Sequence, residues 1–255
     1  MGARSAIETW RAWKGKRRIA ALTAYDYPTG AMAWASGSPL VLVGDSLGMV
    51  ALGFESTQPV TLDMMRHHVA AVARAPGEGM LVADLPNGTY GRPEEAVASS
   101  RALIEAGATA VKAEGGRSIA ESVAAIRAEG IDYLGHIGLL PQSVAHPSGY
   151  KVVGKTPEER EAVIADARAV QDQGAFAVVL ELVEPKLAQE ITETLAIPTI
   201  GIGSGPYCDG EILVTSDLLH LGPKTPPKHA RPPVNYHALM TDTLRDWVRD
   251  VEERV

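Results

Sequence analysis

Four apolar segments of this chain end in a carboxylate residue. Leu40–Gly44 leads to Asp45, Met80–Ala83 to Asp84, Ala110–Ala113 to Glu114, and Ala175–Leu180 to Glu181. An acid at the end of a buried strand is costly unless it is paired, hydrogen-bonded or bound to a metal ion. One such acid is readily explained as a helix cap or a lysine partner, but four at equivalent places favour a common site. Because hard carboxylate oxygens suit Mg²⁺, with waters completing an octahedron, we predict a Mg²⁺ site.

Two further side chains lie at the ends of the same apolar segments. Lys112 stands two residues before Glu114, so both side chains point to the same side of a strand. Such a lysine either holds a carboxylate substrate or pairs with Asp84 or Glu114. His136 ends the segment that starts at Tyr133. It is interpreted either as a hydrogen-bonded wall or as a catalytic group.

Two glycine-rich motifs compete with this interpretation. Gly44–Gly48 matches the G-x-S-x-G nucleophile elbow, with Ser46 as nucleophile. The motif requires a helix after the serine, whereas Met49–Pro59 contains a glycine, ends in proline and is interpreted as a loop. Gly201–Pro206 resembles a dinucleotide loop but lacks its last glycine, so a tight turn is favoured. His67 and His68 are interpreted as surface or packing residues.

The elements that carry these residues alternate along the chain. Predicted strands are Ile19–Tyr25, Leu40–Gly44, Met80–Leu85, Ala110–Glu114, Tyr133–Ile137, Ala175–Leu182, Pro198–Gly203 and Ile212–Thr215. Predicted helices are Tyr27–Ser36, Thr61–Arg74, Pro93–Ala106, Ser118–Glu129, Pro157–Gln173, Pro185–Leu195 and Tyr236–Glu253. Continuous apolar strands separated by helices indicate a parallel sheet buried on both faces. Eight strands favour a (β/α)8 TIM barrel, whose active sites lie at the carboxyl ends of the strands, over an open doubly wound sheet.

Composition limits the possible classes of protein. The 255 residues carry a net charge of −7, are 45% hydrophobic and include one cysteine, Cys208. An acidic chain with 5% aromatic residues is a poor candidate for nucleic-acid binding. One thiol cannot form an internal disulfide, and no apolar segment suits a membrane span or signal peptide, so we expect a cytoplasmic protein. Without a linker, residues 1–255 are predicted to form one barrel domain with a C-terminal helix. The basic segment Lys14–Arg18 is interpreted as the solvated end of a helix.

About a dozen motifs, collinear between residues 19 and 221, resemble the ketopantoate hydroxymethyltransferase family. They include Thr23-Ala-Tyr-Asp-Tyr27, Val43-Gly-Asp-Ser-Leu-Gly-Met49, Ser56-Thr-Gln-Pro-Val-Thr61, Ala83-Asp-Leu-Pro86, Val111-Lys-Ala-Glu-Gly-Gly116, Gly135-His-Ile-Gly-Leu139, Pro141-Gln-Ser143 and Asp209-Gly-Glu-Ile-Leu-Val214. The resemblance implies a barrel of the phosphoenolpyruvate/pyruvate-type superfamily, assembled as a homo-oligomer, usually a decamer. It implies transfer of a hydroxymethyl group from 5,10-methylenetetrahydrofolate to 3-methyl-2-oxobutanoate, giving 2-dehydropantoate for pantothenate biosynthesis.

The same resemblance implies roles for individual residues. Asp45 and Asp84 would bind Mg²⁺, with Glu114 acting directly or through water. The small 2-oxo acid would be held at Asp45, Ser46, Asp84, Lys112 and His136. Glu181 would be the catalytic base, with Lys112 adding positive charge opposite the developing enolate.

Four segments depart from the pattern of this family. They are Glu55–Pro59, Asn87–Thr89, Glu211 and Lys228–His229. None of them removes an expected metal ligand or the base. They leave three alternatives: a related transferase acting on another 2-oxo acid, a lyase that works without folate, and a non-catalytic subunit. The serine hydrolase that uses Ser46 remains a more remote one.

Overall fold

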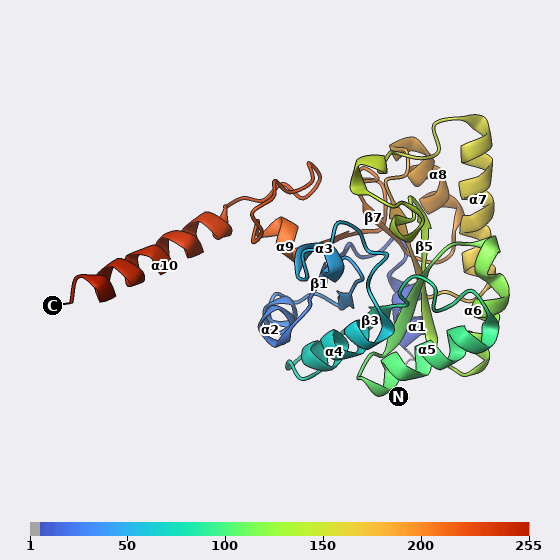
Figure 1. Cartoon of the computed structure of the whole chain (residues 1–255). Coiled ribbons are helices and arrows are strands. Elements are labelled where there is room, and N and C mark those ends of the chain that lie inside the picture. Colours follow the sequence, from blue (N-terminus) through green and yellow to red (C-terminus); the bar gives the residue numbers. More distant parts are fainter. Residues whose placement is uncertain (1–5, 255) are drawn as a thin grey trace. The chain divides into compact units, whose positions relative to one another are not determined.

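Eight parallel strands form a closed barrel in the order β1 to β8 (Figure 1). The computed structural model describes residues 6–254. The strands are β1 (Ile19–Thr23), β2 (Leu40–Val43), β3 (Met80–Asp84), β4 (Ala110–Glu114), β5 (Asp132–Gly138), β6 (Ala177–Glu181), β7 (Thr199–Ile202) and β8 (Gly210–Leu213). The predicted TIM barrel is therefore confirmed, and the open doubly wound sheet is wrong.

Helices follow most of the strands and surround the barrel (Figure 1). They are α1 (Ala6–Trp13), α2 (Tyr27–Ala35), α3 (Leu47–Val50), α4 (Leu62–Ala73), α5 (Pro93–Glu105), α6 (Ala120–Ala128), α7 (Pro157–Asp172) and α8 (Pro185–Thr194), with 3₁₀ turns η1 (Arg117–Ile119), η2 (Pro141–Ser143) and η3 (Pro147–Gly149). Their starts follow ordinary capping chemistry. Thr156, for example, accepts the Glu159 N–H while Pro157 occupies the first turn, where its missing N–H costs nothing.

The alternation of side chains along each strand sorts them into two apolar cores. One core includes residues of the surrounding helices, such as Met65 and Leu187, and lies between strands and helices. The other consists mainly of strand residues and fills the inside of the barrel, with Trp10 of α1 packed edge-on against Phe176. Leu40, Val82 and other large apolar side chains belong to this inner core. Apolar side chains therefore fill the inside of the barrel, and polar side chains that could do chemistry lie at the carboxyl ends of the strands.

At the opposite end of the barrel, an ion pair joins the residue after α1 to the residue before β8. Lys14 Nζ lies 2.7 Å from Asp209 Oδ2, and the Gly15 N–H donates to Asp209 Oδ1 at 3.0 Å. The Ile19 N–H donates to the Asp209 carbonyl at 3.1 Å, which closes β1 against β8. A Cβ on Gly210 would lie 2.3 Å from the Ile19 carbonyl oxygen, so only glycine permits this approach. The sequence predicted that Lys14–Arg18 is the solvated end of a helix. This is wrong for Lys14, which is paired with Asp209, whereas Lys16, Arg17 and Arg18 are exposed.

Most of the element boundaries differ slightly from the prediction, as the start of β8 and the segment after Ser46 illustrate. The last strand begins at Gly210 rather than Ile212, and its first two residues, Gly210 and Glu211, pair with β7. The segment after Ser46 was expected to be a loop from Met49, but a single helical turn, α3, occupies Leu47–Val50. Gly53, at φ 75°, lies in the loop that follows.

The chain divides into two compact units, the first ending at Ile212 and the second beginning at Leu213. The second contains α9 (Thr215–Leu218) and α10 (Tyr236–Glu252), the helix expected at Tyr236–Glu253. Within it, the His237 N–H donates to the His220 carbonyl at 2.9 Å. A single domain over residues 1–255 stays a prediction. In the part of the chain from residue 6 to 254, no helix combines the length and apolarity needed to cross a membrane.

Candidate active site at the carboxyl ends of the strands

The strand-end acids lie inside the barrel because they continue the inner side of each strand. Along β4, Ala110 belongs to the inner core, so Lys112 and Glu114 point the same way. Asp84 pairs in register with Lys112, and Glu114 pairs with His136. The alternation of β6 turns Glu181 inward as well. The side chains of Asp45, Asp84, Lys112, Glu114 and His136 are all buried.

Asp84 contacts two of the other expected site residues, Lys112 and Asp45. Its Oδ1 accepts a hydrogen bond from the Lys112 ammonium, and its Oδ2 accepts the Asp45 backbone N–H at 3.0 Å. The ion pair is buried on both sides, with 5% of the Lys112 side chain and 4% of the Asp84 side chain exposed. Both oxygens of Asp84 are therefore engaged. The pairing of Lys112 with Asp84, one of the two alternatives for this lysine, is confirmed.

Gln142 contacts two of the acids in the site, although the sequence predicted no role for it. Its Nε2 donates to Asp45 Oδ2 at 2.7 Å, and its backbone N–H donates to Glu114 Oε2 at 3.0 Å. It lies in η2, directly after β5, and is buried. The motif Pro141-Gln-Ser143 is one of those that resemble the family pattern, and it follows a strand. These two features were the signal from which a role for Gln142 could have been predicted.

His136 lies between two carboxylates of neighbouring strands. Its Nδ1 is 3.7 Å from Glu114 Oε1, and its Nε2 is 3.2 Å from Glu181 Oε2. Both interpretations of His136, as a hydrogen-bonded wall and as a catalytic group, stay predictions. Glu181 keeps 18% of its side chain exposed and faces the site. The next residue, Leu182, has φ 46°, an uncommon conformation for a leucine.

Ser46 does not have the surroundings of a hydrolase nucleophile. Its Oγ lies 2.9 Å from the hydroxyl of Tyr25, and no histidine bonds it in the part of the chain that is described. Its backbone, at φ −52° and ψ −19°, is ordinary right-handed helix rather than a strained elbow. These features favour a polar wall residue over a nucleophile.

The carboxylates of the site outnumber the positive charges. Burial, followed by the nearby Asp84, raises the pKa of Asp45 to about 7. Burial and the charge of Asp45 raise the pKa of Glu114 well above its usual range. Burial alone would lower the pKa of Lys112, but the surrounding carboxylates raise it, so this residue stays charged. Burial and Lys112 lower the pKa of His136, which keeps the imidazole neutral.

This charge balance fits a divalent cation. Asp45, Asp84, Glu114 and Glu181 face one ammonium, that of Lys112, and hard oxygens are the ligands that Mg²⁺ prefers. Burial, followed by the negative charge of neighbouring carboxylates, raises the pKa values of Asp45 and Glu114. In residues 6–254, however, no three His, Cys, Asp or Glu side chains are arranged to hold a metal ion. The donor chemistry therefore fits the predicted metal, while Asp84 is engaged by Lys112.

The other sequence motifs have structural contacts. In the Gly201–Pro206 turn, Ser204 Oγ donates to the Leu180 carbonyl at 2.7 Å and accepts the Val183 N–H at 2.9 Å. His68 Nδ1 lies 2.5 Å from the Tyr25 carbonyl oxygen, whereas His67 is exposed. These contacts tie loops of the barrel together.

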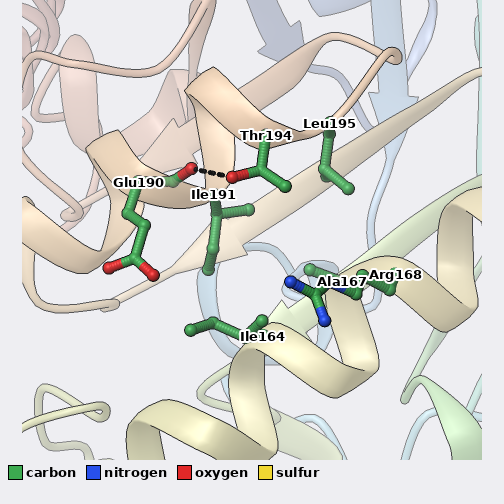
Figure 2. A pocket seen from close by; sticks show the side chains of 7 residues that line it. All are labelled: Ile164, Ala167, Arg168, Glu190, Ile191, Thr194 and Leu195. Carbon is green, nitrogen blue, oxygen red and sulfur yellow. Dashed lines mark hydrogen bonds between the residues drawn. The ribbon is translucent and has the colours of Figure 1, made fainter.

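A small pocket lies between α7 and α8, away from the inward-facing strand ends (Figure 2). Its acid, Glu190, is paired with Arg160 at 2.6 Å, and the Thr194 hydroxyl donates to the Glu190 carbonyl at 2.8 Å. The rest of its lining is mostly apolar, including Ile164 and Leu195. Among the residues that line this pocket, there is no cluster of acids like the one at the strand ends.

Solved structures share this fold. A phosphoenolpyruvate phosphomutase from Streptomyces platensis superposes with a TM-score of 0.67 at 13% identity, covering 96% of this chain and 88% of that one. A 2,3-dimethylmalate lyase of the PEP mutase/isocitrate lyase superfamily superposes with a TM-score of 0.60 at 15% identity, covering 99% and 89%. At these identities the likeness shows the fold alone.

Sequence relatives are much closer. The 3-methyl-2-oxobutanoate hydroxymethyltransferase of Caldivirga maquilingensis is 49% identical over 94% of this chain and 91% of its own length. The enzyme of the same name from Carboxydothermus hydrogenoformans is 47% identical over 93% of this chain and 87% of its own. The family model for ketopantoate hydroxymethyltransferase matches residues 4–255. This chain therefore belongs to the ketopantoate hydroxymethyltransferase family, a family of enzymes.

Proposed function

We propose that this chain transfers a hydroxymethyl group from 5,10-methylenetetrahydrofolate to 3-methyl-2-oxobutanoate, giving 2-dehydropantoate for pantothenate biosynthesis. The observation that carries the proposal is the buried excess of carboxylate charge at the strand ends of a barrel of this family. Asp45 and Asp84 would hold Mg²⁺, with Glu114 acting directly or through water. When bound, the ion would polarise the keto and carboxylate oxygens of the 2-oxo acid and so acidify C3.

Glu181 is the proposed base. It reaches the site from β6, on the far side of His136 from Glu114, and it keeps partial access to solvent. Its carboxylate would take the C3 proton, and the electrons of the broken C–H bond would form the enolate. The enolate carbon would then attack the methylene carbon of the folate donor as one of its two C–N bonds breaks. Water would replace the remaining folate nitrogen on that carbon, which supplies the hydroxyl group and releases tetrahydrofolate.

The remaining residues would hold the substrate and balance its charge. Lys112 stays protonated in the middle of the acids, so it can stabilise negative charge that develops on the substrate oxygens. Ser46, oriented by Tyr25, and His136 would contact the 2-oxo acid. His136 stays neutral, so it would orient the substrate by hydrogen bonding rather than by charge.

The test is proton–deuterium exchange at C3 of 3-methyl-2-oxobutanoate, followed by NMR in D₂O with Mg²⁺ and then with methylenetetrahydrofolate. We expect Mg²⁺-dependent exchange without folate and 2-dehydropantoate after folate is added. Glu181→Gln should abolish exchange, whereas Glu211→Gln, an exposed acid on β8, should leave it unchanged. Exchange at the wild-type rate in Glu181→Gln would refute the base. Exchange only with other 2-oxo acids, or turnover without folate, would refute the proposed substrate or donor.

The same proposal includes a cytoplasmic homo-oligomer. Sedimentation of the full chain tests the expected decamer, and a monomer at micromolar concentration would refute it.

A further inference from the structure

Every polar group of Gln142 has a partner within the barrel mouth. Besides its two bonds to Asp45 and Glu114, its Nε2 donates to the Leu85 carbonyl at 3.0 Å. Its own backbone carbonyl accepts Gln58 Nε2 at 3.0 Å. Its Oε1 accepts the Tyr90 hydroxyl at 2.6 Å. A buried amide with all of its hydrogen-bonding capacity used is held in one orientation.

Tyr90 and two acceptors together fix the orientation of this amide. A phenol has a single proton, and the 2.6 Å contact to Gln142 is much shorter than the 3.4 Å contact from the same hydroxyl to the Glu114 carbonyl. If the amide were flipped, its oxygen would face Asp45 Oδ2 and the Leu85 carbonyl, two acceptors. The NH₂ group would then lose both good acceptors. These two acceptors therefore hold the NH₂ group of Gln142 toward Asp45, and the donating Tyr90 hydroxyl holds the amide oxygen on the other side.

The two donors of Gln142 join acids that come from different strands. Asp45 follows β2 and Glu114 ends β4, and the two carboxylates repel each other when both are ionised. Without a donor between them, each carboxylate could turn away toward solvent or another partner. Gln142 places one N–H on each, so one residue sets the positions of both carboxylates.

We infer that Gln142, oriented by the Tyr90 hydroxyl, is a positioning residue that presets the Asp45 and Glu114 carboxylates for the divalent cation. This inference rests on the metal site of the proposed function. Partners that orient metal ligands in this way are typically worth about 10–100-fold in metal affinity. Gln142→Leu should therefore weaken metal binding by about 10–100-fold, and Tyr90→Phe by about tenfold.

The experiment measures Mn²⁺ binding to the full chain by electron paramagnetic resonance, without substrate. Tyr133→Phe is the matched control, because Tyr133 is fully buried on β5 and its hydroxyl has no hydrogen-bond partner within the described residues. We expect wild-type affinity in Tyr133→Phe and weaker binding in Tyr90→Phe. The double variant Tyr90→Phe/Gln142→Leu should bind no more weakly than Gln142→Leu alone, because Tyr90 acts through Gln142.

A second readout separates positioning from loss of structure. In Tyr90→Phe, the exchange rate at C3 should recover at high Mg²⁺ concentration, which a misfolded barrel would not allow. Unchanged Mn²⁺ affinity in both single variants would overturn the inference. If the losses of affinity in the two single variants add up in the double variant, Tyr90 does not act through Gln142, and its part of the inference is wrong. If Gln142→Leu does not fold, Tyr90→Phe, which removes one oxygen atom, still decides. Failure of the wild-type chain to bind Mn²⁺ would refute the proposed metal site itself, and the inference with it.

Discussion

Replacing Asp45 by asparagine should make the metal-free protein more stable. Burial and Asp84 raise the pKa of Asp45 from its ordinary 3.8 to about 7. A carboxyl whose pKa is raised in the folded state binds more protons there than in the unfolded chain. The free energy of unfolding of the metal-free wild type therefore falls as pH rises from about 4 to about 7.

The size of the effect follows from the same shift. At 1.36 kcal/mol for each pH unit, a rise from 3.8 to about 7 costs about 4 kcal/mol once Asp45 is fully ionised. Asparagine has nearly the same shape, carries no charge and can still accept the hydrogen bond from Gln142 Nε2. At pH 8 in EDTA, Asp45→Asn should therefore exceed the wild type in stability by up to about 4 kcal/mol, and near pH 4 the two should be similar.

Urea unfolding at pH 8, in EDTA and in Mg²⁺, provides the assay. Mg²⁺ at about a hundredfold excess over its Kd should stabilise the wild type by about 2.7 kcal/mol and should not stabilise Asp45→Asn. Asp209→Asn is the control, because it should lower the free energy of unfolding, whereas Asp45→Asn should raise it. Burial would raise the pKa of Asp209, but the Lys14 ammonium and backbone N–H donors hold it below its usual range. This variant should lose about 1–3 kcal/mol. A destabilised Asp45→Asn at pH 8 in EDTA would refute the charge argument.

Three further predictions concern the same barrel mouth. Lys112→Met should destabilise the metal-free protein by about 3–5 kcal/mol in urea unfolding, because Asp84 is left buried without its cation; an unchanged unfolding midpoint would contradict this. The affinity for Mn²⁺ should rise about tenfold between pH 6 and pH 8 in titration calorimetry, because Asp45, with a pKa of about 7, must lose its proton to bind. A flat pH profile would argue against Asp45 as a ligand. Gly138→Ala should cost at least about 2 kcal/mol in thermal unfolding and slow C3 exchange, because Gly138 has φ 97° and a Cβ there would lie 2.3 Å from the Glu181 carbonyl oxygen. Wild-type exchange in a folded Gly138→Ala would show that Glu181 tolerates the shift.

Periodicity predicted those parts of the site that are built on strands. Asp84, Lys112 and Glu114 continue an inward-facing alternation, so their convergence follows from the barrel geometry. The pairing of Lys112 was left open, because the sequence does not say which of two adjacent acids an ammonium contacts. The structure decides for Asp84, directly opposite in register.

Gln142 could not be predicted in the same way. Its partners stand 28 and 97 residues away along the chain, and two of its five bonds use its backbone. No pattern of residue types records such contacts between loops. Two other features could not be predicted either. The four-residue helix α3 is too short to show periodicity, and the pairing of Gly210 and Glu211 with β7 is a backbone contact that residue types do not record.

The pairing of Lys14 with Asp209 has a consequence for the order in which the barrel assembles. These partners stand 195 residues apart, and the neighbouring Ile19–Asp209 backbone bond closes the seam between the first strand and the last. Joining such distant segments carries a large entropic cost of loop closure, and β1 is synthesised long before β8. We therefore expect this seam to form last during folding and to open first in the native protein. In hydrogen exchange, the Ile19 amide should exchange before the Leu85 amide, which bonds the Lys112 carbonyl across β3 and β4.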